Sequence, residues 1–176
     1  MNRTNALAVG DAGRMGFTDV RTYMYAVIFL LGNIMLPQLC HLVPGAGATW
    51  LPIYFFTLVG AYLMGWRVGL LTAVASPLVN SVVFGMPAPE LLPVIMMKSS
   101  LLAISASVAA HLFRNVSLVV MLSVIVAYQA LGTVGEWLMG ASWFVAFQDF
   151  RIGMPGMLVQ IVGGYLLIRY FLKKGI

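Results

Sequence analysis

One lysine is unusual in this sequence because it lies inside an apolar run that is long enough to cross a lipid bilayer. The run covers residues 91–113, and Lys98 lies about two turns from its beginning. Placing an ammonium group inside a membrane costs about 2.5–3.5 kcal/mol on insertion scales. Such a charge is normally paired and faces a bundle interior or a cavity. Lys98 therefore marks a candidate site.

Glu136 is the natural partner for Lys98. It lies near the end of another apolar run, 118–139, at a compatible depth if the long lysine side chain extends toward the membrane surface. Two interpretations stay open: the two residues form a buried ion pair that makes both charges tolerable, or they bind a charged group of a ligand. Trp137 and Trp143 follow closely, and they are expected either to cover a ligand or to anchor the protein at the membrane interface.

Five further residues are weaker candidates for ligand contacts. Asn80 and Gln160 have hydrogen-bonding capacity at membrane depth, although each alone is more often a bond between helices. His41, Trp50 and Gln148 lie in or beside the longer connections between the apolar runs. Function is often located in long loops on a rigid scaffold, so we include them in the candidate ligand site.

The other chemistry-bearing residues do not form a catalytic or metal-binding pattern. His41 and His111 are far apart in the sequence, and Cys40 is the only cysteine. An internal disulfide and a cysteine-based metal cluster are therefore not expected. Ser142 follows Gly140 and Ala141 but lacks the surroundings of a serine nucleophile. We expect no enzymatic activity, no bound metal and no cofactor.

Composition places the chain among integral membrane proteins. Of its 176 residues, 61% are hydrophobic and 9% are charged, whereas soluble domains carry about 25% charged residues. The net charge of +5 does not indicate nucleic-acid binding, because no basic stretch is long enough. The expected partner of the chain as a whole is the lipid bilayer.

The apolar runs predict an all-α bundle, because lipid forces a spanning backbone into helices or a closed barrel and alternating strand patterns are absent. A spanning helix needs about 20 largely apolar residues. Residues 1–22 are expected to form a cytoplasmic N-terminal segment, and residues 23–176 a single transmembrane domain. Six helices are expected, over residues 23–43, 50–65, 68–84, 91–113, 118–139 and 154–172.

The distribution of basic residues predicts the orientation of these helices. If the N-terminus is cytoplasmic, eight of the ten Lys and Arg residues fall on the inner side, where such residues are enriched. The N- and C-termini are therefore both expected in the cytoplasm, with the protein in the cytoplasmic (inner) membrane. The eight residues are Arg3, Arg14, Arg21, Arg67, Arg114, Arg169, Lys173 and Lys174.

The middle of the chain resembles a known family. Residues 48–61 (ATWLPIYFFTLVGA), 65–73 (GWRVGLLTA), 76–81 (SPLVNS) and 85–87 (GMP) are similar to the substrate-binding S components of energy-coupling factor (ECF) transporters. The similar part covers about residues 42–110. The rest agrees with that family in helix number, in a cytoplasmic N-terminus and in a long outer connection between the fifth and sixth helices.

This resemblance implies a function in uptake. S components capture a micronutrient at the outer face, beneath the first loop and the loop between the fifth and sixth helices. They associate with a membrane T component that is driven by two cytosolic ATPase subunits. The ligand expected here is a small, planar, water-soluble micronutrient with at least one ionisable group, such as a vitamin, a nucleobase-like compound or a related precursor.

A second interpretation comes from a different class of protein. The chain would then be a membrane scaffold with a fold like that of the cell-shape protein MreD, without small-molecule transport. A channel is less compatible with the sequence, because the polar residues gather in the outer half and form no stripe through the full membrane depth.

Overall fold

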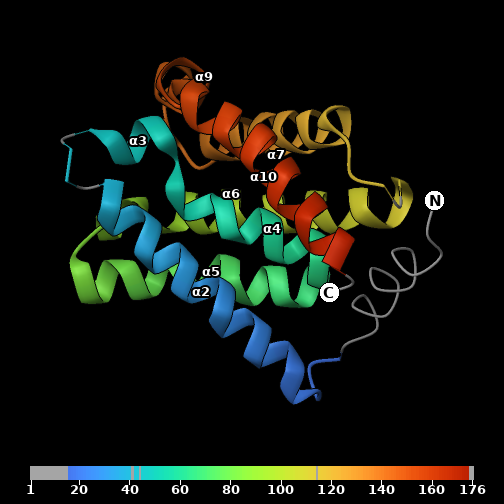
Figure 1. Ribbon diagram of the computed structural model, residues 1–176. Coiled ribbons are helices and arrows are strands. Elements are labelled where there is room, and N and C mark those ends of the chain that lie inside the picture. The colour runs from blue at the N-terminus through green and yellow to red at the C-terminus, as the bar shows by residue number, and fades with distance from the viewer. Residues whose placement is uncertain (1–15, 41, 44, 114, 175–176) are drawn as a thin grey trace.

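The computed structural model describes residues 16–40, 42–43, 45–113 and 115–174, and every regular element within them is helical. The expected all-α class is thereby confirmed. Five of the helices are long and apolar enough to cross a membrane, so the chain is a multi-pass membrane protein (Figure 1). They are α2 (Val20–Cys40), α5 (Trp66–Phe84), α6 (Leu92–Phe113, extended by η2, Pro89–Leu91), α7 (Leu118–Leu138) and α10 (Met154–Lys174).

The helix expected over residues 50–65 differs from its prediction. A short helix, α3 (Ala46–Trp50), ends before Leu51, whose backbone is left-handed with φ 47° and ψ 47°. The chain then restarts with η1 (Pro52–Tyr54) and α4 (Phe55–Met64). Proline at the first position begins a helix well because it has no N–H to satisfy. The apolar segment Pro52–Met64 is too short to count among the candidate spans.

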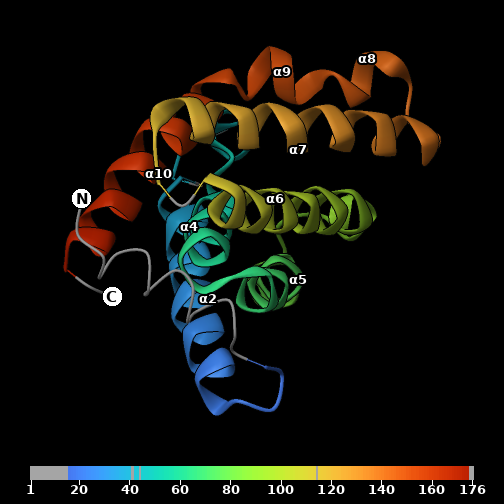
Figure 2. The same cartoon turned by 90° about the vertical axis from the view of Figure 1, so that its right-hand side faces the viewer.

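Although α4 is only 10 residues long, it lies at the centre of the bundle. It packs against α2, α5, α6 and α10, and Leu58 and Val59 are fully buried. Helices α5, α6 and α7 lie side by side, and α6 packs between the other two (Figure 2). Many large apolar side chains on the outer faces of the helices are exposed, as Val82 on α5 is at 83%. Such faces suit contact with lipid tails.

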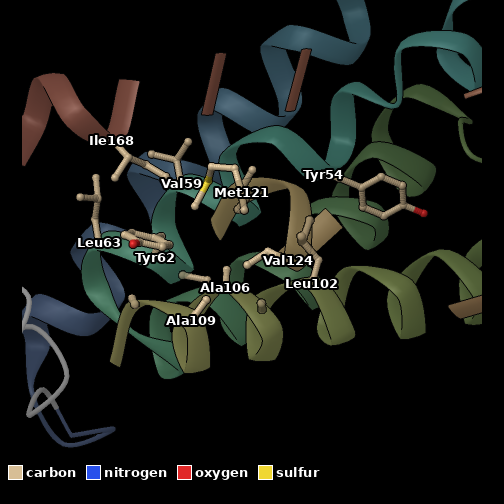
Figure 3. Close-up of a cluster of buried hydrophobic side chains, with 14 of the residues drawn as sticks. Tyr54, Val59, Tyr62, Leu63, Leu102, Ala106, Ala109, Met121, Val124 and Ile168 are labelled. Carbon is tan, nitrogen blue, oxygen red and sulfur yellow. The ribbon is translucent and has the colours of Figure 1, made fainter. Parts of the chain in front are cut away.

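The core combines bulky side chains with small residues that let backbones approach closely. Figure 3 shows Tyr62, Leu102 and Met121 converging from three helices. A Cβ added to Gly69 on α5 would lie 2.5 Å from that of Ala61 on α4 and 3.1 Å from that of Ala103 on α6. Small residues at such crossings are typical of membrane helix packing, where no hydrophobic force joins helices already in lipid.

A buried polar residue joins three of the helices. The Asn33 amide group on α2 donates to Thr57 Oγ1 on α4 at 2.9 Å and to Ser76 Oγ on α5 at 3.1 Å. Its Oδ1 accepts a hydrogen bond from the Phe56 N–H at 3.0 Å. Asn80 adds bonds from its amide to the carbonyls of Asn33 and Ser76. These bonds fix the rotation of α2 against α4 and α5.

Replacing Asn33 with leucine is expected to loosen this junction. Three hydrogen bonds are lost, each worth roughly 0.6 kcal/mol between membrane helices, which corresponds to a fall of about 5 °C in unfolding temperature. Thermal unfolding in mild detergent measures the change. Asn115→Leu, at an exposed position, is the matched control and should leave the unfolding temperature almost unchanged. Equal effects of the two substitutions would contradict the proposed role of Asn33.

Candidate functional site

A cavity of about 390 Å³ lies at one end of the bundle, where α5 and α7 end and α6 begins. Its walls come from α2, α3, η1, residues 86–88, α6, α7 and the short helices α8 (Trp143–Ala146) and α9 (Gln148–Ile152). Small-molecule sites commonly occupy cavities of about 300–1,000 Å³. The cavity is therefore large enough for a small ligand.

Three charged side chains meet at this cavity. Lys98 Nζ on α6 lies 2.5 Å from Glu136 Oε2 on α7 and 2.8 Å from Asp149 Oδ2 on α9. Lys98 is 3% exposed and Glu136 is 9% exposed, and all three residues line the cavity. The structure thus brings the two main candidates from the sequence together and adds a second carboxylate. This group of three residues is called the ionic triad below.

A glycine determines how Lys98 reaches its partners. A Cβ added to Gly132 on α7 would lie 2.7 Å from Lys98 Cγ and 3.3 Å from its Cε. The lysine stem therefore runs across the bare backbone at Gly132. Glu136 is four residues further along α7 and lies on the same helix face, one turn closer to the helix end. This register aims the ammonium group at the Glu136 carboxylate.

Asp149 comes from a segment that reverses direction after α7. Gly140, with φ 99°, forms the turn, and the Ser142 hydroxyl accepts a hydrogen bond from the Val145 N–H to begin α8. The segment α8–α9 then runs back along α7 (Figure 2), with Ala146 fully buried. Helix α9 also contacts α3 and α10. The reversal brings Asp149 back to the depth of Lys98.

Sequence reasoning missed Asp149 as a site residue. Its signal was present, since the chain has only five acidic residues and a buried lysine needs counter-charge. The direction of the chain after Gly140 was not readable from the sequence. Tyr54, which is 2% exposed and lines the cavity, was also missed.

The other predicted contacts are distributed unevenly. Gln148 lines the cavity beside the ionic triad. Trp137 and Trp143 do not; they are 50% and 57% exposed and form a T-shaped pair with ring centroids 6.0 Å apart. Trp50 also lies outside the lining, and its carbonyl group abuts Gly156 of α10. His41 lies outside the described residues.

Two polar candidates, Asn80 and Gln160, belong to helix packing instead of the cavity lining. Asn80 takes part in the junction around Asn33. Gln160 on α10 accepts a hydrogen bond from the Tyr128 hydroxyl at 3.1 Å and donates to the Leu51 carbonyl at 3.5 Å. The bond to Leu51 satisfies a carbonyl at the break between α3 and η1.

The cavity wall away from the ionic triad is mostly apolar. The expected indole rings do not line it, because Trp137 and Trp143 lie on the outer surface of α7 and α8. The apolar side chains that line it include those of Leu51, Ile53, Met86, Leu91 and Ile95. The arrangement combines charge at one point with apolar surface elsewhere, which can orient a small amphipathic molecule.

Two buried polar side chains continue from Glu136 along α7. Thr133 and Gln129 lie three and seven residues before it, so the three share one helix face. Neither the Thr133 hydroxyl nor either polar atom of the Gln129 amide has a hydrogen-bond partner among the described residues. Buried groups of this kind usually bind ordered water. The polar strip therefore extends inward beyond the ionic triad.

Comparisons with known proteins identify no relative. No family model, no curated protein and no solved structure matches the chain. Within the described residues, no group of three or more His, Cys, Asp or Glu side chains is arranged to hold a metal ion.

Replacing Lys98 with methionine is expected to destabilise the protein. Two carboxylates would then face each other without their shared ammonium group. Removing one partner of a buried ion pair costs about 3–5 kcal/mol, and partial exposure of the Asp149 side chain, 21%, favours the lower value. The fall in unfolding temperature in detergent measures this loss. Lys173→Met, at an exposed position near the end of α10, is the control.

A triple substitution separates charge from packing. Lys98→Met combined with Glu136→Gln and Asp149→Asn removes all three charges, so it should regain most of the stability lost in the single variant. A triple variant as unstable as Lys98→Met would show that the lysine stem, and not its charge, stabilises this end of the bundle.

Proposed function

We propose that this protein is the substrate-specific S component of an ECF-type importer, which captures a small micronutrient at the outer face of the membrane. The observation that carries the proposal is the cavity at one end of an apolar helical bundle, with a buried ionic triad in its wall. A purely structural membrane bundle has no need of both an internal cavity and buried charges. A binding subunit uses a cavity to hold its ligand and a few polar or charged groups to orient it.

The proposed topology has six spans, with α4 and its η1 extension as the short second span and both termini in the cytoplasm. Basic side chains support it: Arg67 is the second residue of α5, and Lys173 and Lys174 end α10. The cavity lies at the opposite end of α5, where α6 begins. Because cytoplasmic connections are enriched in Lys and Arg, this distribution supports a cavity on the outer side. The membrane would be the cytoplasmic one.

The partners in this proposal are a membrane T component and two cytosolic ATPase subunits. The S component would supply recognition of the solute, and the ATPase subunits would supply the energy for its release inside the cell. The resemblance of residues 42–110 to S components is the basis for these partners. The cavity supports only the recognition step.

The proposal predicts that a small molecule co-purifies with the protein in mild detergent and that filling the cavity removes it. Val94 lines the cavity, so Val94→Trp would occupy much of the space. Val82→Trp makes the same change on an exposed face of α5 and is the matched control. Mass spectrometry of extracted small molecules is the measurement. We expect at least a tenfold lower yield from Val94→Trp than from Val82→Trp.

The same measurement tests the scaffold alternative. If the original protein yields no small molecule, and if cells expressing it with a T component and ATPases accumulate no solute, the S-component proposal is wrong. A scaffold of the MreD type would then remain as the explanation for the bundle.

A further inference from the structure

The ionic triad has a surplus of negative charge. Lys98 contributes one positive charge, and Glu136 and Asp149 contribute two carboxylates, both within 2.8 Å of the same ammonium nitrogen. From this imbalance we infer that the cavity takes a small organic cation with an apolar body. The cationic group would lie against the Glu136 and Asp149 carboxylates. This inference rests on the proposed function, because it assumes that the cavity receives a solute.

Lys98 is poorly available to an anionic ligand. The protein already supplies two carboxylates to its ammonium group, one in a hydrogen bond of 2.8 Å. An anion would have to displace one of these carboxylates, which would then remain beside a like charge in a largely buried position. A cationic ligand meets no such obstacle, because the Lys98 ammonium group balances only one of the two carboxylate charges. The expectation that Lys98 itself binds a charged group of the ligand is therefore revised.

No other cation lines the cavity among the described residues. The basic residue of the α8–α9 segment is Arg151, whose guanidinium group lies over the Phe144 ring, 4.0 Å from its centroid. Neither residue is part of the cavity wall. Glu90, which is exposed, immediately precedes the lining residue Leu91 and adds negative charge near the cavity. Electrostatic attraction of a cation is thus favoured along the approach as well as inside.

The apolar part of the wall determines the rest of the ligand. Leu51, Ile53 and Ile95 lie in the same cavity as the ionic triad. A strongly hydrated inorganic ion would leave this surface without a partner. A molecule with one positive group and a flat or aliphatic body would satisfy both parts of the wall.

Three probes with a common benzyl body test this assignment. Benzyltrimethylammonium is cationic, neopentylbenzene is its neutral isostere, and benzylsulfonate is anionic. Titration calorimetry in a neutral maltoside detergent measures their Kd values for the full-length protein. We expect benzyltrimethylammonium to bind at least tenfold more tightly than either of the other probes.

Variants then locate the charge. Asp149→Asn should weaken benzyltrimethylammonium binding at least tenfold, whereas Glu90→Gln, the same loss of a carboxylate outside the ionic triad, should change Kd less than threefold. Lys98→Met should keep or strengthen binding of this probe, and the probe should raise the unfolding temperature of that variant by more than that of the original protein. In effect the probe would replace the missing ammonium group.

Several results would overturn the inference. They are undetectable binding of benzyltrimethylammonium, equal or tighter binding of the neutral or anionic probe, and an unchanged Kd in Asp149→Asn. Benzylsulfonate binding that disappears in Lys98→Met would show that the site takes anions. If a neutral or anionic molecule co-purifies with the original protein and is lost in Val94→Trp, the proposed function is supported but the cationic ligand class is rejected. Probe binding without any co-purified solute would support the charge assignment and count against the importer.

Discussion

The need to neutralise one ammonium group inside an apolar bundle determines much of this structure. Lys98 reaches Glu136 because Gly132 lets its stem cross the α7 backbone. It reaches Asp149 because the chain turns back at Gly140 and runs along α7. Without that counter-charge the helix would carry an isolated charge in a low-dielectric surrounding, which is strongly unfavourable. The cavity is formed by the same elements that deliver the two carboxylates.

The two ends of the bundle are built differently. Toward the end away from the cavity, small residues such as Gly69, Ala61 and Ala103 bring α4, α5 and α6 into close contact. Toward the cavity, polar and charged side chains meet at helix ends and in short helices. A tightly packed end can serve as a rigid support for a hollow one, which is how binding sites are commonly positioned.

The helices and the Lys98–Glu136 pair were predictable because they depend on local composition and on depth in the membrane. The break at Leu51 was not, since a left-handed leucine arises from its surroundings and only Pro52 hints at it. Asp149 required the reversal after Gly140, which no periodic pattern in the sequence encodes. The Asn80 amide could contact a ligand or form a hydrogen bond between helices. Only the position of Asn33 shows that Asn80 forms a hydrogen bond between helices.

The separation of the charged partners along the chain has a consequence for biosynthesis. Asp149 follows Lys98 by 51 residues, so the ribosome completes the Pro89–Phe113 segment before either carboxylate has been made. At that point its ammonium group has neither of the carboxylate partners that it has in the folded protein. Its 25-residue length supplies enough apolar side chains to offset that penalty on insertion. Membrane entry of this helix thus depends on its own aliphatic residues, because Glu136 and Asp149 are synthesised after it.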